Sequence, residues 1–448
     1  MQAEWTAHAE RAAAAAALLR EQPAGAPLAL AKPTSNLFRD RRPAPRHRLD
    51  LGRFTHVLQA HANGWVDVEG STTYEELVAW TLARGVMPAV VPQLKTITVG
   101  GAAAGVGIEA SSFRHGLVHD TLSEIEVLLP HGDIVVATPE NEFADLFFGF
   151  PNSYGTLGYA LRLRARTVPV KPFVHLRHRP IGDAQRFFDA MADACGGDAD
   201  FVEGVVFAPG RHVLSTGHFT ARAPWRSDYT SHAIYWRSLL AREEDYLSAA
   251  DYLWRWDTDW FWCSRNFGAQ HPLVRRLFGP KRLNSRTYTR WMRQASRWRL
   301  AQRWAALRGL YRESVIQDVD IPLARAAEFL DFLQREIGIA PVWVCPVRGE
   351  VDGRRFPLYP LGKASLYVNF GFWDAVLSQE ALAPGYFNRK IEREVLRLGG
   401  IKSLYADSCF SRETFAAAYG GKAYEALKRK YDPQGRSPHL YDKCVRAL

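Results

Sequence analysis

Hydrophobic and polar positions alternate in short runs between residues 27 and 170. Glycine, proline and aspartate separate apolar segments that predict strands at 28–32, 64–70, 87–93, 96–101 and 155–170. Two β-branched runs flank His131-Gly132-Asp133 and predict a hairpin over 124–138. Residues 72–85 instead repeat apolar side chains at helical spacing and end at Gly85, which predicts one helix. Strands, a helix and further strands indicate an α+β domain.

From about residue 171 to 330 the periodicity becomes helical, and the composition becomes basic and aromatic. Residues 271–312 contain twelve Lys or Arg and no Asp or Glu. Helical offsets place four arginines on one face, and a second apolar series follows the same offsets. The members of these patterns are Trp254, Trp256, Trp260 and Trp262, then Arg286, Arg290, Arg293 and Arg297 beside Trp291 and Trp298, then Leu300, Trp304, Leu307 and Tyr311.

Elsewhere, strands are predicted at 340–347 and 365–372, and helices at 326–337 and 388–398. Glu4 and Glu10 precede the N-terminal alanine run, so this segment is interpreted as a short amphipathic helix rather than a signal peptide. No stretch of 18 apolar residues occurs, so no membrane span is predicted. The expected organisation is an N-terminal helix (1–26), a first domain (27–170), a second domain (171–400) containing a basic helical region (250–312), and a C-terminal segment (401–448).

Composition narrows the class of protein. The 448 residues are 47% hydrophobic and 23% charged, which is typical of a globular chain, and the formal net charge is +10. This charge favours polyanions, either nucleic acid or an anionic membrane. Five dispersed cysteines without a CxxC pair indicate a reducing cytoplasm and no zinc ribbon, and no metal site is predicted. The alanine and arginine content suggests a bacterial source.

The glycine-rich stretch at 92–112 suits either a phosphate cradle or a tightly packed structural corner. No Lys-Ser/Thr pair follows its glycines, which excludes a Walker A loop, and Ala110 stands where a Rossmann fingerprint needs its third glycine. Two other polar turns suit a pyrophosphate: residues 32–39, which carry hydroxyl, amide and guanidinium donors, and residues 151–164.

Three blocks, "KPTSNLFR", "GVMPAVVPQLKTITVGGAAAGVGIEASSFRHGLVHD" and "ADLFFGFPNSYGTLGYALRLR", occur in this order. Together they resemble the FAD-binding domain of the vanillyl-alcohol-oxidase and para-cresol-methylhydroxylase (PCMH) superfamily, most of all its 24-dehydrocholesterol reductase (Diminuto) branch. "SVIQDVDIPL", "PVWVCPV", "LYADSCFSRETF" and "HLYDKCV" extend the resemblance from about residue 28 to 446. It implies an α+β fold: a two-subdomain FAD-binding PCMH-type domain followed by an α+β substrate (cap) domain with a basic, Trp-rich helical insertion.

The resemblance also implies which residues hold FAD. Thr34, Ser35 and Asn36 would contact the pyrophosphate, and Gly155 and Gly158 would lie near the adenine half or the ring edge. The residues implied along the pyrophosphate, ribitol and isoalloxazine are Gln93, Thr96, Thr98, Gly100, Gly101, Gly107, Ile108, Glu109, Ser111 and Ser112. The first loop contains neither His nor Cys, so FAD is expected to be non-covalent, and His115 and His119 are interpreted as ordinary polar or core residues.

Reduction of a double bond needs hydride from the flavin and a proton from an acid, and desaturation needs a base. The catalytic candidates are Glu109, Tyr405, Asp407 and Gln317, with Asp318, Tyr367 and Asn369 also considered. The alternatives are that Asp407 caps the helix after it and that Tyr367 is a half-buried strand residue. Cys409 is interpreted as inert packing.

The sequence therefore predicts an FAD-dependent oxidoreductase that reduces or desaturates a carbon–carbon bond of a hydrophobic lipid. A methyl-branched or methylene fatty acyl chain of a membrane phospholipid is the expected substrate. A sterol-type double-bond reductase, an oxidase or dehydrogenase of a small alcohol, and a non-enzymatic nucleic-acid binder are the alternatives. The Trp/Arg region suits a membrane, RNA or a core helix with a solvated face, and the resemblance favours the membrane. The expected location is cytoplasmic and peripheral on the inner face of the cell membrane, with a possible separate electron-transfer partner and no nucleic acid.

Overall fold

Two β-sheets dominate the computed structural model, which describes residues 2–23, 26–32, 38–39, 47–297 and 300–445. A six-stranded sheet has the order β3-β4-β8-β6-β7, with β5 paired to β8. Its strands are Val57–His61, Trp65–Glu69, Tyr159–Pro169, Leu122–Leu128 and Ile134–Ala137, and β5 is Val86–Pro88. The predicted hairpin is the β6–β7 pair, in which Ile125 lies opposite Ala137.

An eight-stranded sheet follows in the order β12-β9-β11-β10-β14-β15-β13-β16. In that order its strands are Glu244–Ser248, Phe173–Ile181, Arg211–Thr220, Phe201–Ala208, Val342–Arg348, Leu366–Ser378, Tyr311–Pro322 and Ile401–Lys402. Helices α6 (Ala184–Gly196), α12 (Ala326–Phe332) and α13 (Tyr386–Arg397) bury apolar side chains against one face of this sheet. The other face shares a continuous apolar core with the six-stranded sheet.

Local signals explain the first helices. Thr73 caps α2 (Tyr74–Leu82) in a reciprocal capping box with Glu76, and Gly85 adopts φ +73° beyond its end. In contrast, the predicted strand at 96–101 is wrong. Thr98 caps α3 (Val99–Ala104) by accepting from the Gly101 amide at 3.2 Å, and the Gly-Gly-Ala-Ala-Ala run contains no β-branched residue to favour a strand.

The helical periodicity predicted from residue 171 is also wrong at its start. Residues 173–248 contain the four strands β9, β10, β11 and β12, with only α6 and α7 (Tyr235–Ser238) between them. Val174 and Leu176 are buried while Arg177 and Arg179 are exposed, a period-two pattern that the basic composition concealed. Helices do occur further on: α8 is Ala249–Leu253, α9 is Pro272–Phe278, α10 is Ser285–Arg297 and α11 is Leu300–Leu307. Tyr311 begins β13 instead of continuing the apolar helical series.

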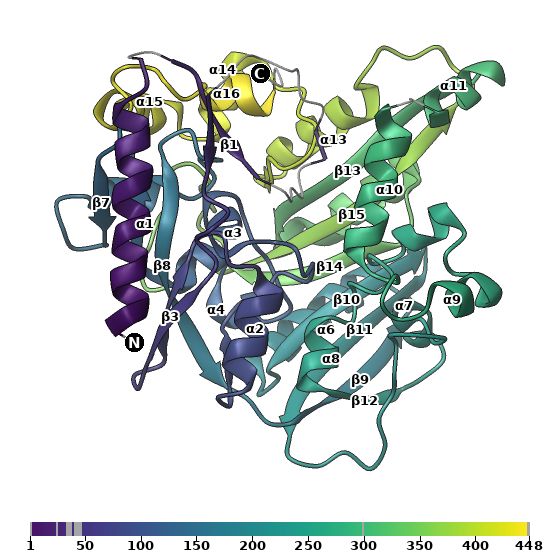
Figure 1. Ribbon diagram of the computed structural model, residues 1–448. Helices are drawn as coiled ribbons and strands as arrows, with labels where there is room; N and C mark the ends of the chain where they lie inside the picture. Colours follow the sequence, from purple (N-terminus) through teal and green to yellow (C-terminus); the bar gives the residue numbers. More distant parts are fainter. Residues whose placement is uncertain (1, 24–25, 33–37, 40–46, 298–299, 446–448) are drawn as a thin grey trace.

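Both ends of the described chain pack on the first half of the molecule (Figure 1). Helix α1 (Gln2–Arg20) is fixed by His8, whose Nδ1 lies 2.7 Å from Glu69 Oε1 and whose Nε2 lies 3.0 Å from Glu126 Oε1. Helices α14 (Arg412–Ala418), α15 (Gly421–Tyr431) and α16 (Leu440–Cys444) return to the same half. Arg436 Nη1 donates to the Leu19 carbonyl at 3.0 Å, so the two end segments touch.

Two short β-segments and two small helices complete this half. Strands β1 (Leu28–Ala31) and β2 (His47–Asp50) pair in parallel, and α4 (Ser112–His115) and α5 (Ala144–Gly149) follow the loops considered below. Among the described helices, none combines the length and apolar character needed to cross a membrane.

Candidate functional site

The three segments that resemble a flavin site lie together around α3. Lys32 Nζ donates to Thr98 Oγ1 at 2.8 Å, which joins the first loop to the glycine stretch. The Tyr154 amide donates to the Ala104 carbonyl at 2.8 Å, which joins the turn at 151–155. Thr34, Ser35 and Asn36 lie outside the described residues, but Lys32 and Phe38 place the two ends of their loop at this site.

The glycines of the site are required first by packing between chain segments. A Cβ on Gly107 would lie 2.6 Å from Val118 Cγ2 and 3.0 Å from Pro92 Cγ. Gly158 has φ +143°, and its Cβ would lie 2.7 Å from Val127 Cγ1. A Cβ on Gly101 would instead face the Lys32 ammonium group at 3.1 Å. Close approach of the Val118 and Pro92 side chains therefore accounts for Gly107. A positive φ and the nearby Val127 side chain account for Gly158, and Gly101 borders a positive charge.

Several buried polar atoms around these loops have no hydrogen-bond partner among the described residues. Both amide atoms of Gln93 are in this state although the residue is only 4% exposed, as are Asn152 Oδ1 and Ser153 Oγ. Leaving such a group unpaired costs about 1–3 kcal/mol. Asn152 and Tyr154 also adopt φ +61° and +51°, which non-glycine residues rarely do outside functional turns. A polar ligand with donors and acceptors fits this arrangement, and Lys32 suits its pyrophosphate, so the residues present fit FAD.

Other predicted FAD contacts are already bonded within the loop. Ser111 Oγ donates to the Ala89 carbonyl at 2.8 Å, and Ser112 Oγ accepts from the Glu109 amide at 3.1 Å. Thr96 is buried and Ile108 is half-buried. These residues shape the loop in the structure, and their direct contact with FAD stays a prediction.

Glu109 is fully buried in an ionic group that joins the two sheets. Arg255 Nη2 donates to Glu109 Oε1 at 2.9 Å and Arg255 Nε donates to Glu203 Oε1 at 2.8 Å. Trp256 and Trp343 donate their indole N–H groups to Glu203 Oε2 at 3.0 and 2.8 Å. Burial raises the pKa of Glu109 against the pull of Arg255. Burial also acts to raise the pKa of Glu203, but Arg255 and the indole hydrogen bonds lower it overall.

Strand β13 separates two adjacent candidates. Gln317 points toward α13, where its Nε2 donates to Asn388 Oδ1. Asp318 therefore points to the opposite face, where it hydrogen-bonds to the hydroxyl of Tyr405. Burial raises the pKa of Asp318 to about 7, although the Tyr405 hydrogen bond lowers it. Trp373 Nε1 donates to the Tyr405 hydroxyl oxygen at 2.8 Å.

Tyr405 connects this acid to the first loop. The Phe38 amide donates to the Tyr405 carbonyl at 2.9 Å, and the rings of the two residues are 5.8 Å apart. The Phe38 ring also lies 5.6 Å from the ring of Trp260. Phe38 and Trp260 thus form an aromatic wall beside Tyr405. Phe38 follows Asn36, the last residue expected to contact the pyrophosphate, by two positions.

The remaining candidates have mainly structural contacts. Asp407 does not cap the following helix, because Ser411 is the cap of α14 and accepts from the Thr414 amide at 3.0 Å. Tyr367 is buried in β15, and Asn369 Nδ2 donates to Asp320 Oδ1 at 2.9 Å. Burial raises the pKa of the Cys409 thiol to about 11, which keeps it protonated at neutral pH. Among the described residues, no group of His, Cys, Asp and Glu is suited to hold a metal ion.

The two histidines near the glycine stretch are packing residues. His119 stacks edge-on against Phe356, with ring centroids 4.3 Å apart, and burial lowers its pKa to about 3. Burial also lowers the pKa of His115, to about 4.

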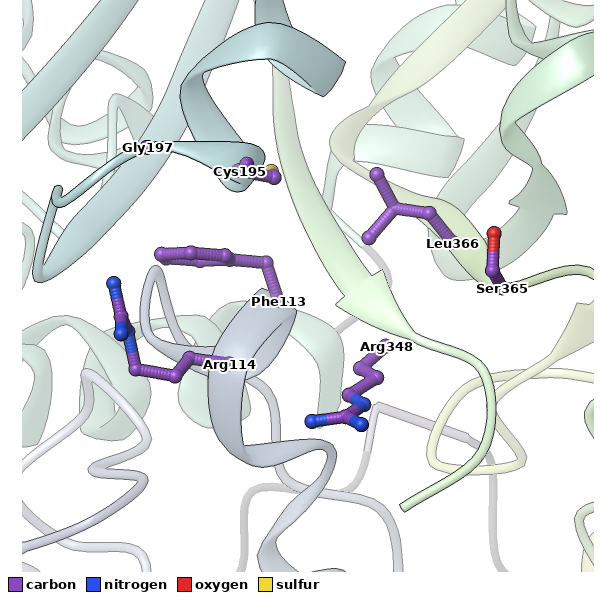
Figure 2. Close-up of a pocket in the computed structure, with 8 residues that line it drawn as sticks. Phe113, Arg114, Cys195, Gly197, Arg348, Ser365 and Leu366 are labelled. Carbon is purple, nitrogen blue, oxygen red and sulfur yellow. The ribbon is translucent and has the colours of Figure 1, made fainter.

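Figure 2 shows a pocket of about 470 Å³ beside α4, and none of the candidate catalytic residues lines it. Arg114 and Arg348 contribute to its wall, and Arg114 Nη2 already donates to the Ala199 carbonyl at 2.8 Å. Burial raises the pKa of Cys195 to about 12, so its thiol is not a ready nucleophile. The pocket is therefore separate from the site around Tyr405.

Sequence reasoning missed Arg255, Glu203, Trp373 and Lys32, and it chose Gln317 instead of Asp318. The alternation within "VIQDVDI" could have shown that Gln317 and Asp318 face opposite ways, since valines and isoleucine mark the two sides. No local signal joins Glu109 to Arg255, which lies 146 positions away.

Comparison with known proteins supports FAD binding by this chain. Residues 7–138 match the family model described as an FAD binding domain. Delta(24)-sterol reductase of Arabidopsis thaliana is 26% identical over 90% of this chain and 77% of its own length. The corresponding human protein is 29% identical (85% and 74%), and the Delta(24)-sterol reductase homolog of Caenorhabditis elegans is 24% identical (85% and 75%). The chain is therefore an FAD-dependent oxidoreductase with an FAD-binding PCMH-type domain, homologous to the Delta(24)-sterol reductases over most of its length.

Proposed function

We propose that this protein reduces a carbon–carbon double bond in the side chain of a sterol or of a similarly extended, uncharged lipid. The observation that carries the proposal is the Asp318–Tyr405–Trp373 group beside the aromatic wall of Phe38 and Trp260. The named relatives support a sterol-type substrate better than the fatty acyl chain expected from the sequence. Their eukaryotic sources also give no support to the expected bacterial origin, which stays a prediction.

Bound FAD, in its reduced form, would supply hydride to one carbon of the double bond. Lys32, Gln93 and the loop at 33–37 would hold its polar half. Tyr405 would give a proton to the second carbon: its O–H bond breaks as the new C–H bond forms. Asp318, protonated below its raised pKa of about 7, would return a proton to the Tyr405 oxygen. The Trp373 N–H stabilises negative charge on that oxygen during the transfer.

We further propose that the protein works on the cytoplasmic face of a membrane, where its lipid substrate resides. The net charge of +10 and the basic run at 271–312 support attraction to anionic lipid. The sequence carries no second dinucleotide motif, so we infer a separate electron donor.

A half-reaction tests the proposed chemistry. The flavin of the purified, FAD-loaded protein is reduced chemically without oxygen, and a Δ24 sterol in detergent is added. Return of the oxidised flavin absorbance, with a product heavier by two hydrogens in mass spectrometry, is expected. A second arm uses an unsaturated phospholipid: reoxidation there alone favours the fatty acyl substrate, and reoxidation by neither lipid overturns the proposal.

A further inference from the structure

Helix α9 exposes two leucines one turn apart. Leu273 and Leu277 are 70% and 78% exposed, and their i, i+4 spacing makes them neighbours on the helix surface. The opposite side of the helix is fixed by buried Arg275, whose Nη1 lies 2.5 Å from Asp259 Oδ1 and whose Nη2 donates to the Ala233 carbonyl at 3.0 Å. The leucines therefore face outward because the buried arginine sets the rotation of α9.

A second apolar pair lies on α11. Trp304 is 54% and Leu307 86% exposed, and the Arg308 guanidinium lies 3.6 Å from the centre of the Trp304 ring. Among the described residues, Leu307, Leu277 and Leu273 are the three most exposed large hydrophobic side chains. Figure 1 shows α9, α10 and α11 along the side of the molecule away from α1. Single exposed leucines are unremarkable, but two exposed apolar pairs within one basic segment indicate a contact surface.

The charge around these side chains has one sign. Residues 271–312 contain twelve Lys or Arg and no acidic residue. Arg275 is paired with Asp259 and Arg286 with Glu75, both outside this segment. The exposed basic side chains around the leucines include Arg276, Lys281, Arg282, Arg290 and Arg303. The surface thus combines outward leucines with positive charge, which complements anionic headgroups above acyl chains.

The inner side of α10 reaches the candidate active site. Tyr288, Trp291 and Met292 belong to an apolar cluster with Trp260 and Phe38. Phe38 in turn contacts Tyr405. Apolar side chains therefore connect the inner side of α10, through Trp260 and Phe38, to the proposed proton donor.

We propose that α9, α10 and α11 form a membrane-docking surface, in which Leu273, Leu277, Trp304 and Leu307 insert into a bilayer with anionic headgroups. Lipid substrate then enters beneath α10, a step that rests on the proposed function. RNA is a poorer occupant, because three of the four exposed side chains are leucines that cannot stack on bases. A second copy is also poorer, because two equally basic surfaces repel each other. Trp256, Trp260 and Trp262 do not take part, because all three are buried.

Vesicle binding of the full-length, FAD-loaded chain tests the surface. Sedimentation with phosphatidylcholine vesicles containing phosphatidylglycerol is expected to exceed that with phosphatidylcholine alone, and to weaken as salt rises. The L273S/L277S double variant is expected to lose binding about tenfold per leucine. Leu18→Ser is the matched control, because Leu18 is 56% exposed on α1, and it should bind as the wild type does.

The double variant must retain the wild-type flavin content and unfolding midpoint. Wild-type vesicle binding by that folded variant overturns the proposal, as does tighter binding of RNA than of anionic vesicles. A change of oligomeric state in the variant without loss of vesicle binding overturns it in favour of a self-contact. None of these measurements uses turnover, so they are independent of the half-reaction with detergent-solubilised sterol.

Discussion

The raised pKa of the Asp318 carboxyl group predicts how the rate of sterol reduction depends on pH. Burial raises its pKa from 3.8 to about 7, so the acid form that can resupply Tyr405 is present below pH 7 and is lost above it. The rate of sterol reduction should be flat below about pH 7 and fall above it. Asp318→Asn should remove this inflection and slow the reaction by about 10²–10⁴-fold, the usual contribution of a general acid. Measured pH profiles of kcat and kcat/KM check both; an unchanged inflection in the variant would refute the assignment.

Arg255 forms ion pairs with two buried carboxylates, Glu109 and Glu203. Arg255→Met would leave Glu109 and Glu203 without their common partner, and we expect it to destabilise the fold by about 3–5 kcal/mol. Glu109→Gln keeps an acceptor for Arg255 and should cost far less stability. Urea unfolding of both variants measures the difference. Equal stability of Arg255→Met and wild type would contradict the pairing.

At the residue scale, the sequence predicts which residue types a site needs better than it predicts which face of a strand each side chain occupies. Tyr405 and Glu109 are named as candidates because they stand in recognisable blocks, and their catalytic roles stay predictions. Asp318 is passed over for Gln317 because one position decides which face of β13 a side chain occupies. Glu109→Ala should affect the fold as well as turnover, because it leaves the buried Arg255 without one of its partners.

The tight packing of Gly107 against Val118 and Pro92 can be tested by substitution. Gly107→Ala would place a methyl group 2.6 Å from Val118 and 3.0 Å from Pro92, and should displace the neighbouring loop with Gln93. We expect a loss of about 1–3 kcal/mol of stability and a lower ratio of flavin to protein absorbance. Gly196→Ala is the control, because nothing lies within 4 Å of its added methyl group.

A second substitution makes the Gly107 test specific. Val118→Ala removes Val118 Cγ2, the atom nearest to the new methyl group, so the double variant should regain part of the lost flavin. No recovery would show that Gly107 acts through backbone conformation or direct contact with the ligand.

At the element scale, local rules succeed where the deciding contacts are local. Helix α2 and the β6–β7 hairpin depend mainly on neighbouring residues, and both are predicted correctly. Strand β9 is missed because His and Arg alternate with its buried valine and leucine, and pairing with β11 and β12 supplies the stability that its composition does not.

His8 joins α1 to the six-stranded sheet and gives the whole molecule a pH dependence. Burial alone would lower its pKa, but hydrogen bonds with Glu126 and Glu69 raise it from 6.5 to about 9. Its contribution to stability is therefore full below about pH 6.5 and is lost as pH rises through 9, by up to about 3 kcal/mol. Thermal unfolding between pH 6 and 10 should show this decline in wild type and a smaller one in His8→Gln. Parallel curves would mean that His8 does not hold α1.

At the scale of the molecule, the order of the blocks predicts an FAD-binding domain, and residues 7–138 match the corresponding family model. Sequence does not show how the two sheets share a core, because this depends on contacts such as Arg255 with Glu109 between residues far apart in the chain.

The C-terminal segment, which returns to the first half of the molecule, has a consequence for biosynthesis. Arg39 Nη1 donates to the Leu404 carbonyl at 2.5 Å, Lys428 Nζ donates to the Thr156 carbonyl at 2.9 Å, and the Leu28 amide donates to the Arg436 carbonyl at 2.8 Å. The first half of the chain therefore leaves the ribosome long before residues 404–436, which complete it, have been translated. Its apolar surface stays uncovered until the eight-stranded sheet has been synthesised, so we expect flavin capture to follow translation and nascent chains to need chaperones.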